Sequence, residues 1–254
     1  MKEGSWINLP SLSLSVKSLF TGYILVTGIG LMMAGVQIML THGMADGKFG
    51  LSVDDIVYSY YGNRQGSKLE SKLHGSMKDK ATPQENLTLI KWARNGSPEA
   101  EWQPVIKPIV EAKCAVCHAH ISTLPNITKF ETMKEVAKID HGAEISALTR
   151  VSHIHLFGIA FIFFFIGFIF SMAVGIKRWI KAVIIFIPFA FLIIDVASWW
   201  LTKINPSFAY LVIIGGFGYS LASAFMLFTS LYQMWIMPWK GQTSDENTWQ
   251  QQGK

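Results

Sequence analysis

Long apolar blocks separated by one polar stretch form the main pattern of the chain. Four blocks, at about 18–41, 152–175, 179–202 and 208–236, are long enough to cross a hydrocarbon core, which requires roughly 20 apolar residues. The polar stretch between the first two blocks carries helix signals and little strand pattern. The chain is therefore predicted to be all-α, with four transmembrane helices and a small helical domain inserted between spans one and two. Its parts are an N-terminus with transmembrane helix 1 (1–41), the polar domain (42–150), transmembrane helices 2–4 (151–237) and a tail (238–254).

The spans differ in the side chains that they offer to neighbours. Spans one and four carry small residues at helical spacing, which lets helix backbones approach closely, so we expect both to pack tightly. Span two is rich in phenylalanine and suits lipid or a partner subunit. In span three, Pro188 predicts a kink, and Trp179 at one end with Trp199 and Trp200 at the other predicts the membrane interfaces. The small residues are Gly22, Gly28, Gly30, Ala34 and Gly35 in span one and Gly215, Gly216, Gly218, Ser220 and Ser223 in span four.

Helix start and stop signals divide the polar domain. Thr82-Pro83-Gln84-Glu85 combines an N-cap, a proline at the first helical position and a capping-box acid, and Asn95-Gly96 predicts the end of that helix. Ser52 is a second candidate N-cap, ahead of two aspartates. We also expect a helix beginning near Pro108 and a last helix at about 129–139.

Composition and charge place the chain in a membrane. Half of its residues are hydrophobic and the mean hydropathy is +0.32. The net charge of +5 does not indicate nucleic acid, because the polar domain is nearly neutral, with 14 Lys+Arg against 13 Asp+Glu. Seven of the eight other basic residues fall on one side if the N-terminus is cytoplasmic. The positive-inside rule then predicts two cytoplasmic termini and a polar domain outside the cytoplasm. The first apolar run is longer than that of a signal peptide, so we interpret it as a retained anchor.

The run Cys114-Ala-Val-Cys117-His118 is the clearest chemical motif. C-x-x-C-H is the spacing at which a chain takes a haem covalently, through two thioether bonds. On a helical turn these positions share one face, so both sulfurs reach one haem edge while the imidazole turns to the iron. A zinc site would need two further ligands at metal-finger spacing, and the sequence has no second such motif. One covalent haem c is therefore predicted.

At about 70–139 the chain resembles the c-type cytochromes. The stretch 105–118 looks like the haem-bearing first helix of that family. The stretch 73–77, Leu-His-Gly-Ser-Met, followed by 84–92, looks like its methionine loop and closing helix. In the family these two pieces follow the haem motif, whereas here they precede it. Either the domain is permuted, or the front piece is an unrelated helical cap.

The resemblance implies that His118 is the proximal iron ligand and that a methionine or a second histidine completes the iron. Met77 is the first candidate for the sixth ligand, and His74 and His141 are the alternatives. A methionine would raise the reduction potential relative to two histidines. A five-coordinate haem that binds a gas is a further alternative. Met133 lies on an amphipathic stretch, which favours packing in a core.

Polar residues near the outer membrane edge suggest a second site. His42 ends span one, His153 and His155 begin span two, and Asp195 lies within span three. A carboxylate inside a span usually faces the bundle interior and a partner. The histidines could simply be interfacial residues, and two functional interpretations are the alternatives. One is a quinol pocket, and the other is a haem b held by His42 with His153 or His155, or a metal held by all three. The two histidines of span two should point in different directions.

These features predict a monohaem cytochrome that transfers electrons on the periplasmic face of the bacterial inner membrane. One helix would tether such a domain, so four spans indicate a subunit of a larger respiratory or oxidoreductase complex. Its expected partners are other membrane subunits and soluble periplasmic electron carriers. The alternative is a protein that oxidises quinol itself, and a haem sensor is a third hypothesis.

Overall fold

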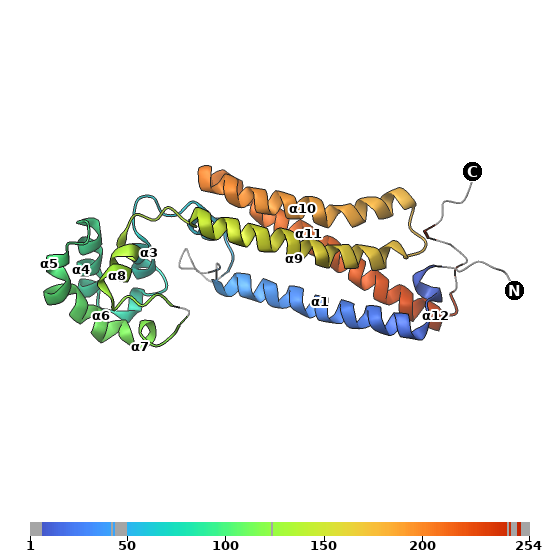
Figure 1. The fold of residues 1–254 in the computed structure, drawn as a ribbon, viewed down its shortest axis with the longest axis horizontal. Helices are drawn as coiled ribbons and strands as arrows, with labels where there is room; N and C mark the ends of the chain where they lie inside the picture. The colour runs from blue at the N-terminus through green and yellow to red at the C-terminus, as the bar shows by residue number, and fades with distance from the viewer. Residues whose placement is uncertain are drawn as a thin grey trace. The chain divides into compact units, whose positions relative to one another are not determined.

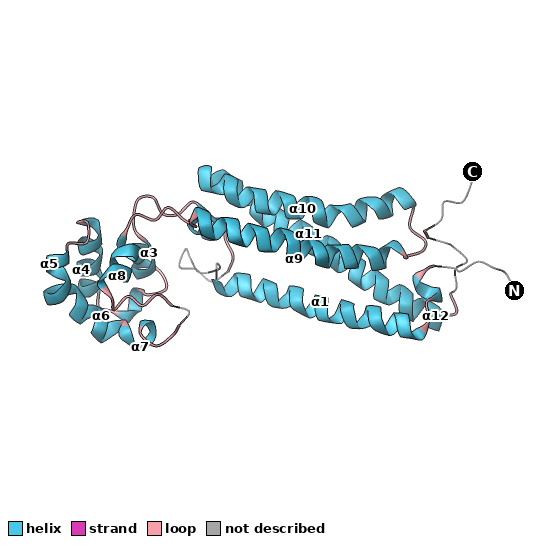
Figure 2. Ribbon diagram, viewed as in Figure 1, coloured by secondary structure: helices cyan, strands magenta, loops and turns pink. Residues whose placement is uncertain are grey.

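The computed structural model describes residues 7–41, 43, 50–122, 124–242, 244 and 248–249. Every regular element in these ranges is a helix, and the one isolated β-bridge pairs Ser67 with Ile139 (Figures 1 and 2). The predicted all-α class is thus confirmed. The chain forms two compact units. The first comprises Met1–Val36, Ser146–Trp199 and Tyr210–Lys254, and the second comprises Gln37–Ile145 and Trp200–Ala209.

Four of the described helices are long and apolar enough to cross a membrane. They are α1 (Leu14–Thr41), α9 (Ile145–Ser171), α10 (Arg178–Ile204) and α11 (Ala209–Leu231). The last continues through the π-helix η5 (Tyr232–Ile236) into α12 (Met237–Trp239). Pro188 lies inside α10, where it removes one backbone hydrogen bond. The protein is therefore a multi-pass membrane protein.

Close contact between α10 and α11 depends on glycine. A Cβ added to Gly215 would lie 2.7 Å from the Cβ of Asp195, and one added to Gly218 would lie 2.6 Å from the ring of Phe191. Ser223 on the same helix is fully buried. The tight packing predicted for span four is confirmed.

The Gly215→Ala variant should separate these two helices and lower stability by about 1–3 kcal/mol, because the contact leaves no room for a methyl group. Thermal unfolding in detergent measures this loss. Gly216→Ala is the matched control, since its added Cβ has only the Tyr219 hydroxyl within 4 Å, at 3.8 Å. Equal stability of the two variants would contradict the packing argument.

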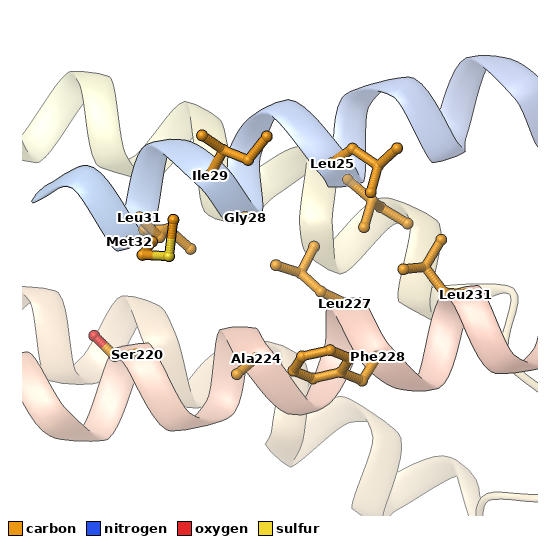
Figure 3. A pocket seen from close by; sticks show the side chains of 11 residues that line it. Leu25, Gly28, Ile29, Leu31, Met32, Ser220, Ala224, Leu227, Phe228 and Leu231 are labelled. Atoms are coloured by element: carbon orange, nitrogen blue, oxygen red, sulfur yellow. The ribbon is translucent and has the colours of Figure 1, made fainter. Parts of the chain in front are cut away.

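The tight packing predicted for span one is wrong. Gly22, Gly28 and Gly30 on α1 have no atom within 4 Å of an added Cβ. Small residues permit a close approach but do not enforce one, and large apolar side chains of α1 and α11 line the space between the two helices. Figure 3 shows these side chains around a groove of about 440 Å³. They include Leu25, Leu31 and Met32 of α1 and Leu227, Phe228 and Leu231 of α11.

Short helices build the second unit. They are α2 (Val53–Tyr60), α3 (Lys68–His74), η2 (Lys78–Lys80), α4 (Pro83–Arg94), α5 (Glu99–Glu101), the π-helix η3 (Trp102–Ile106), α6 (Lys107–Lys113), α7 (Ala115–His118) and α8 (Phe130–Ala137). Ser52 and Thr82 are N-caps, as predicted; both have complete capping boxes, of which only the one at Thr82 was predicted. The helix expected to begin near Pro108 starts earlier, at α5. The helix continues across Pro104 and Pro108 through a π-turn, in which the amide of Lys107 donates to the carbonyl of Trp102.

One hydrophobic core joins α3, α4, η3, α6 and α8. Trp92 is 1% exposed there, and its indole N–H donates to the carbonyl of Pro98. The ring of Trp102 lies 6.0 Å from that of Trp92 and 5.6 Å from that of Phe130. Met133 is fully buried, which confirms its expected packing role. The segment before the C-x-x-C-H motif therefore shares a single core with the segment that carries it.

Candidate functional site

The C-x-x-C-H motif lies where α6 ends and α7 begins. Cys114 caps α6, and the amide of His118 donates to the carbonyl of Cys114 at 3.0 Å. Cys114 is half-buried against the core, Cys117 is exposed, and both are free thiols. The helical turn expected from the spacing is present. It leaves both thiols available for covalent attachment.

The ring of His118 is oriented by a backbone contact. Its Nδ1 lies 2.8 Å from the carbonyl oxygen of Pro125. A carbonyl only accepts, so in the neutral imidazole this contact selects the tautomer with the proton on Nδ1 and a free lone pair on Nε2. Histidines that bind metals are commonly oriented through the other nitrogen in this way. The sequence gives no signal for the contact between Pro125 and His118, because the segment between Pro125 and the motif carries no helical or strand pattern.

The three candidates for the sixth ligand have different surroundings. Met77 is half-buried and packs against the same core as Cys114. His74 is exposed, and its Nε2 lies 3.7 Å from Oε1 of Glu70. His141 is also exposed, and its carbonyl accepts from Nζ of Lys203. Met77 is thus the candidate whose core is shared with the haem motif.

The first turn of α4 places a carboxylate beside the motif. Oε2 of Glu85 accepts from the amide and the hydroxyl of Thr82, each at 2.8 Å, and Oε1 lies 3.9 Å from Nζ of Lys113. The hydrogen bond from the Thr82 amide is the main cause that lowers the pKa of Glu85, and the hydrogen bond from the Thr82 hydroxyl is the second. Burial raises the pKa of the Cys114 thiol, with a smaller contribution from the charge of Glu85. Cys114 is therefore held as a thiol.

The pH dependence of stability should show the contribution of Glu85. Its pKa is lower in the folded chain than the ordinary value of 4.5, so the ionised carboxylate stabilises the fold above that pH. This contribution is lost as the pH falls from 4.5 through the lowered pKa. Urea unfolding should therefore find Glu85→Gln less stable than the parent at pH 7, with the difference shrinking in acid. A constant difference would contradict the assignment.

At the membrane-embedded candidate site, Trp199 joins α9 and α10. Asp195 is 4% exposed, and its Oδ1 accepts from Nε1 of Trp199 at 2.9 Å. The ring of His155 meets the ring of Trp199 edge-on, with centroids 5.1 Å apart. Trp199 was predicted to mark an interface, but it is buried against Asp195. Its spacing of four residues from Asp195 is the sequence signal that identifies the pair.

The other histidines do not join this group. His153 is exposed and its ring lies 5.0 Å from that of Phe157, so the two histidines of span two point in different directions, as expected. His42 lies outside the described residues, so the haem b and metal hypotheses that involve it stay predictions. Within the described ranges, no three or more His, Cys, Asp or Glu side chains converge to hold a metal.

Comparison with known proteins bears on the membrane part. A family model described as a transmembrane helical domain matches residues 133–241, a range that contains α9, α10 and α11. No curated protein matches the chain, and no solved structure matches it. The family match agrees with the apolar helices in indicating a membrane protein.

Proposed function

We propose that this protein is a membrane-bound monohaem c-type cytochrome that transfers electrons. The observation that carries the proposal is the orientation of His118. Its Nδ1 is engaged by the carbonyl of Pro125, which leaves Nε2 free for iron beside the free thiols of Cys114 and Cys117. A structural histidine would not need two unpaired cysteines at this spacing.

The residues around the motif fit a covalently bound haem. Several apolar side chains that pack, like Cys114, against this core stay half-buried, so part of each remains available to an apolar group. These are Met77, Ile109, Phe130 and Val136. In addition, Val116 between the two cysteines is 75% exposed, and Ile121 just after the motif is 47% exposed. Exposed apolar groups at one place commonly mark a binding surface.

The chain's residues have separate tasks in this proposal. Cys114 and Cys117 would attach the group, Nε2 of His118 would bind the iron, and the sulfur of Met77 would be a further ligand. When bound, haem iron supplies one-electron transfer. His/Met ligation raises the reduction potential compared with two histidines, which suits a relay of electrons to an acceptor outside the membrane.

The membrane part supports a role within a larger assembly. Phenylalanines on α9 remain exposed in the isolated chain, among them Phe157 at 62% and Phe161 at 65%. We propose that other membrane subunits of a respiratory or oxidoreductase complex cover this face. In this arrangement the polar domain lies in the periplasm of a bacterium, where soluble electron carriers can reach it, and both termini are cytoplasmic.

The test is a pyridine haemochrome spectrum of the detergent-purified protein, combined with a redox titration. One c-type signal per chain at a single potential is expected. A chain without covalent haem, expressed with the haem attachment machinery, would overturn the proposal.

Quinol oxidation is the second candidate, and the Asp195–Trp199–His155 group favours it. The carboxylate of Asp195 accepts from the indole N–H of Trp199, and the imidazole of His155 lies edge-on to the same ring, so both offer proton acceptors within the membrane. Asp195→Asn should then abolish quinol-dependent haem reduction while dithionite still reduces the haem. His153→Phe is the matched control, because His153 lies apart from this group. Normal quinol-dependent reduction in Asp195→Asn would exclude the candidate, and an acid-extractable b-type signal would instead indicate a second haem.

A further inference from the structure

The first turn of α4 contacts both segments that carry the proposed ligands. Glu85 lies 3.9 Å from Lys113, the residue before Cys114. Its neighbour Asn86 donates from Nδ2 to the carbonyl of Lys78, at 2.8 Å, and Lys78 follows Met77. Two consecutive residues of one helix therefore define where the methionine segment lies relative to the haem motif.

Asn86 is an unusual residue for its position. It is 8% exposed, and its Oδ1 has no hydrogen-bond partner among the described residues. An apolar residue of the same size would avoid the cost of burying this carbonyl oxygen. The one hydrogen bond recorded for its side chain, to Lys78, is therefore the contact that distinguishes asparagine from leucine here.

Hydrogen bonds from α3 and α4 hold the segment that contains Met77. Met77 precedes the single 3₁₀ turn η2, where it makes no side-chain cap. Its amide donates to the carbonyl of Lys72, and its carbonyl accepts from the amide of Lys80. By contrast, α4 begins with a proline and a complete capping box, and its apolar side packs in the core. The helix is the rigid member of the pair, and Asn86 ties the turn to it.

We propose that Asn86 is a positioning residue that holds the sulfur of Met77 at the haem iron and so raises the reduction potential. The proposal rests on the function proposed above. It assigns Asn86 to the placement of the ligand rather than to haem attachment. The number of covalently bound haems should therefore not depend on Asn86, whereas the ligation state should.

Two substitutions test this assignment in the full-length haem-loaded protein. Asn86→Leu keeps the volume and removes the donor. Asn86→Asp keeps the shape and, as a carboxylate, cannot donate to Lys78. We expect both variants to keep one covalent haem, to lose most of the near-infrared charge-transfer band of methionine-ligated ferric haem, and to show a lower reduction potential. Thr88→Val is the control, because the hydroxyl of Thr88 is exposed and bonds within α4 to the carbonyl of Gln84.

The other outcomes are also decisive. Variants that keep the band and the potential of the parent would overturn the role of Asn86, as would loss of covalent haem from both variants, which would assign Asn86 to the core alone. A parent protein with covalent haem but no methionine band would overturn the inference and leave the proposed function standing. A parent without covalent haem would overturn both.

Discussion

Replacing Cys114 and Cys117 together by serine is expected to remove all covalently bound haem from the chain. They are the only two cysteines in the sequence, so the double variant has no thiol left for a thioether bond. Each single variant should keep one bond and a weaker signal. The measurement is haem-dependent peroxidase staining after denaturing electrophoresis, where haem held only by ligation is lost.

Ala115→Ser provides the control for this experiment. It introduces the same hydroxyl within the motif, in α7, but leaves both thiols in place. Its staining should match that of the parent. A double variant that still stains would contradict attachment at these cysteines and would remove the basis of the proposed function.

Gly142→Ala should have the second-largest effect, on the stability of the second unit. Gly142 has φ of +70°, and an added Cβ would lie 2.1 Å from the carbonyl oxygen of Tyr60. A Cβ added to Gly62, which has φ of +83°, would likewise clash with the amide nitrogen of Gly142. The left-handed conformation costs about 1–2 kcal/mol for a residue with a Cβ, and the clash adds about 1–3 kcal/mol. The clash is with backbone, which cannot rotate away.

Hydrogen exchange of the α4 amides measures this loss as a lower free energy of opening, roughly 3 kcal/mol below the parent. Gly96→Ala is the matched control. Gly96 has φ of +84°, yet no atom lies within 4 Å of its added Cβ. It should show the conformational cost alone, about 1–2 kcal/mol. Similar losses in both variants would show that the contact with Tyr60 does not matter.

The contact at Gly142 also orders the connection that leads to α9. The buried carboxylate of Asp140 accepts from the amide of Gly142 at 2.9 Å, and Nζ of Lys203 donates to the carbonyls of His141 and Ala143. His141 is thus bound through its backbone, whereas its side chain is exposed. The backbone of His141 therefore has a structural role that its residue type does not reveal.

Features that depend on neighbouring residues could be predicted from the sequence. The four spans follow from length and apolarity, and the starts of α2 and α4 follow from the capping residues Ser52 and Thr82. The C-x-x-C-H spacing likewise predicts a shared helical turn, which α7 contains. Each of these signals acts over a few residues of one element.

Contacts between distant segments depend on how the helices pack. The sequence could not show that Nδ1 of His118 meets the carbonyl of Pro125, that Asn86 donates to the carbonyl of Lys78, or that Trp199 contacts both Asp195 and His155. Nor could it tell Gly215 and Gly218 of α11, which touch a neighbouring helix, from the glycines of α1, which do not. The helices, the membrane class and the C-x-x-C-H spacing can all be read from the sequence, because capping, apolarity and spacing are local. Which side chains meet around that motif depended on the tertiary structure, because packing brings together residues whose separation in the chain carries no signal.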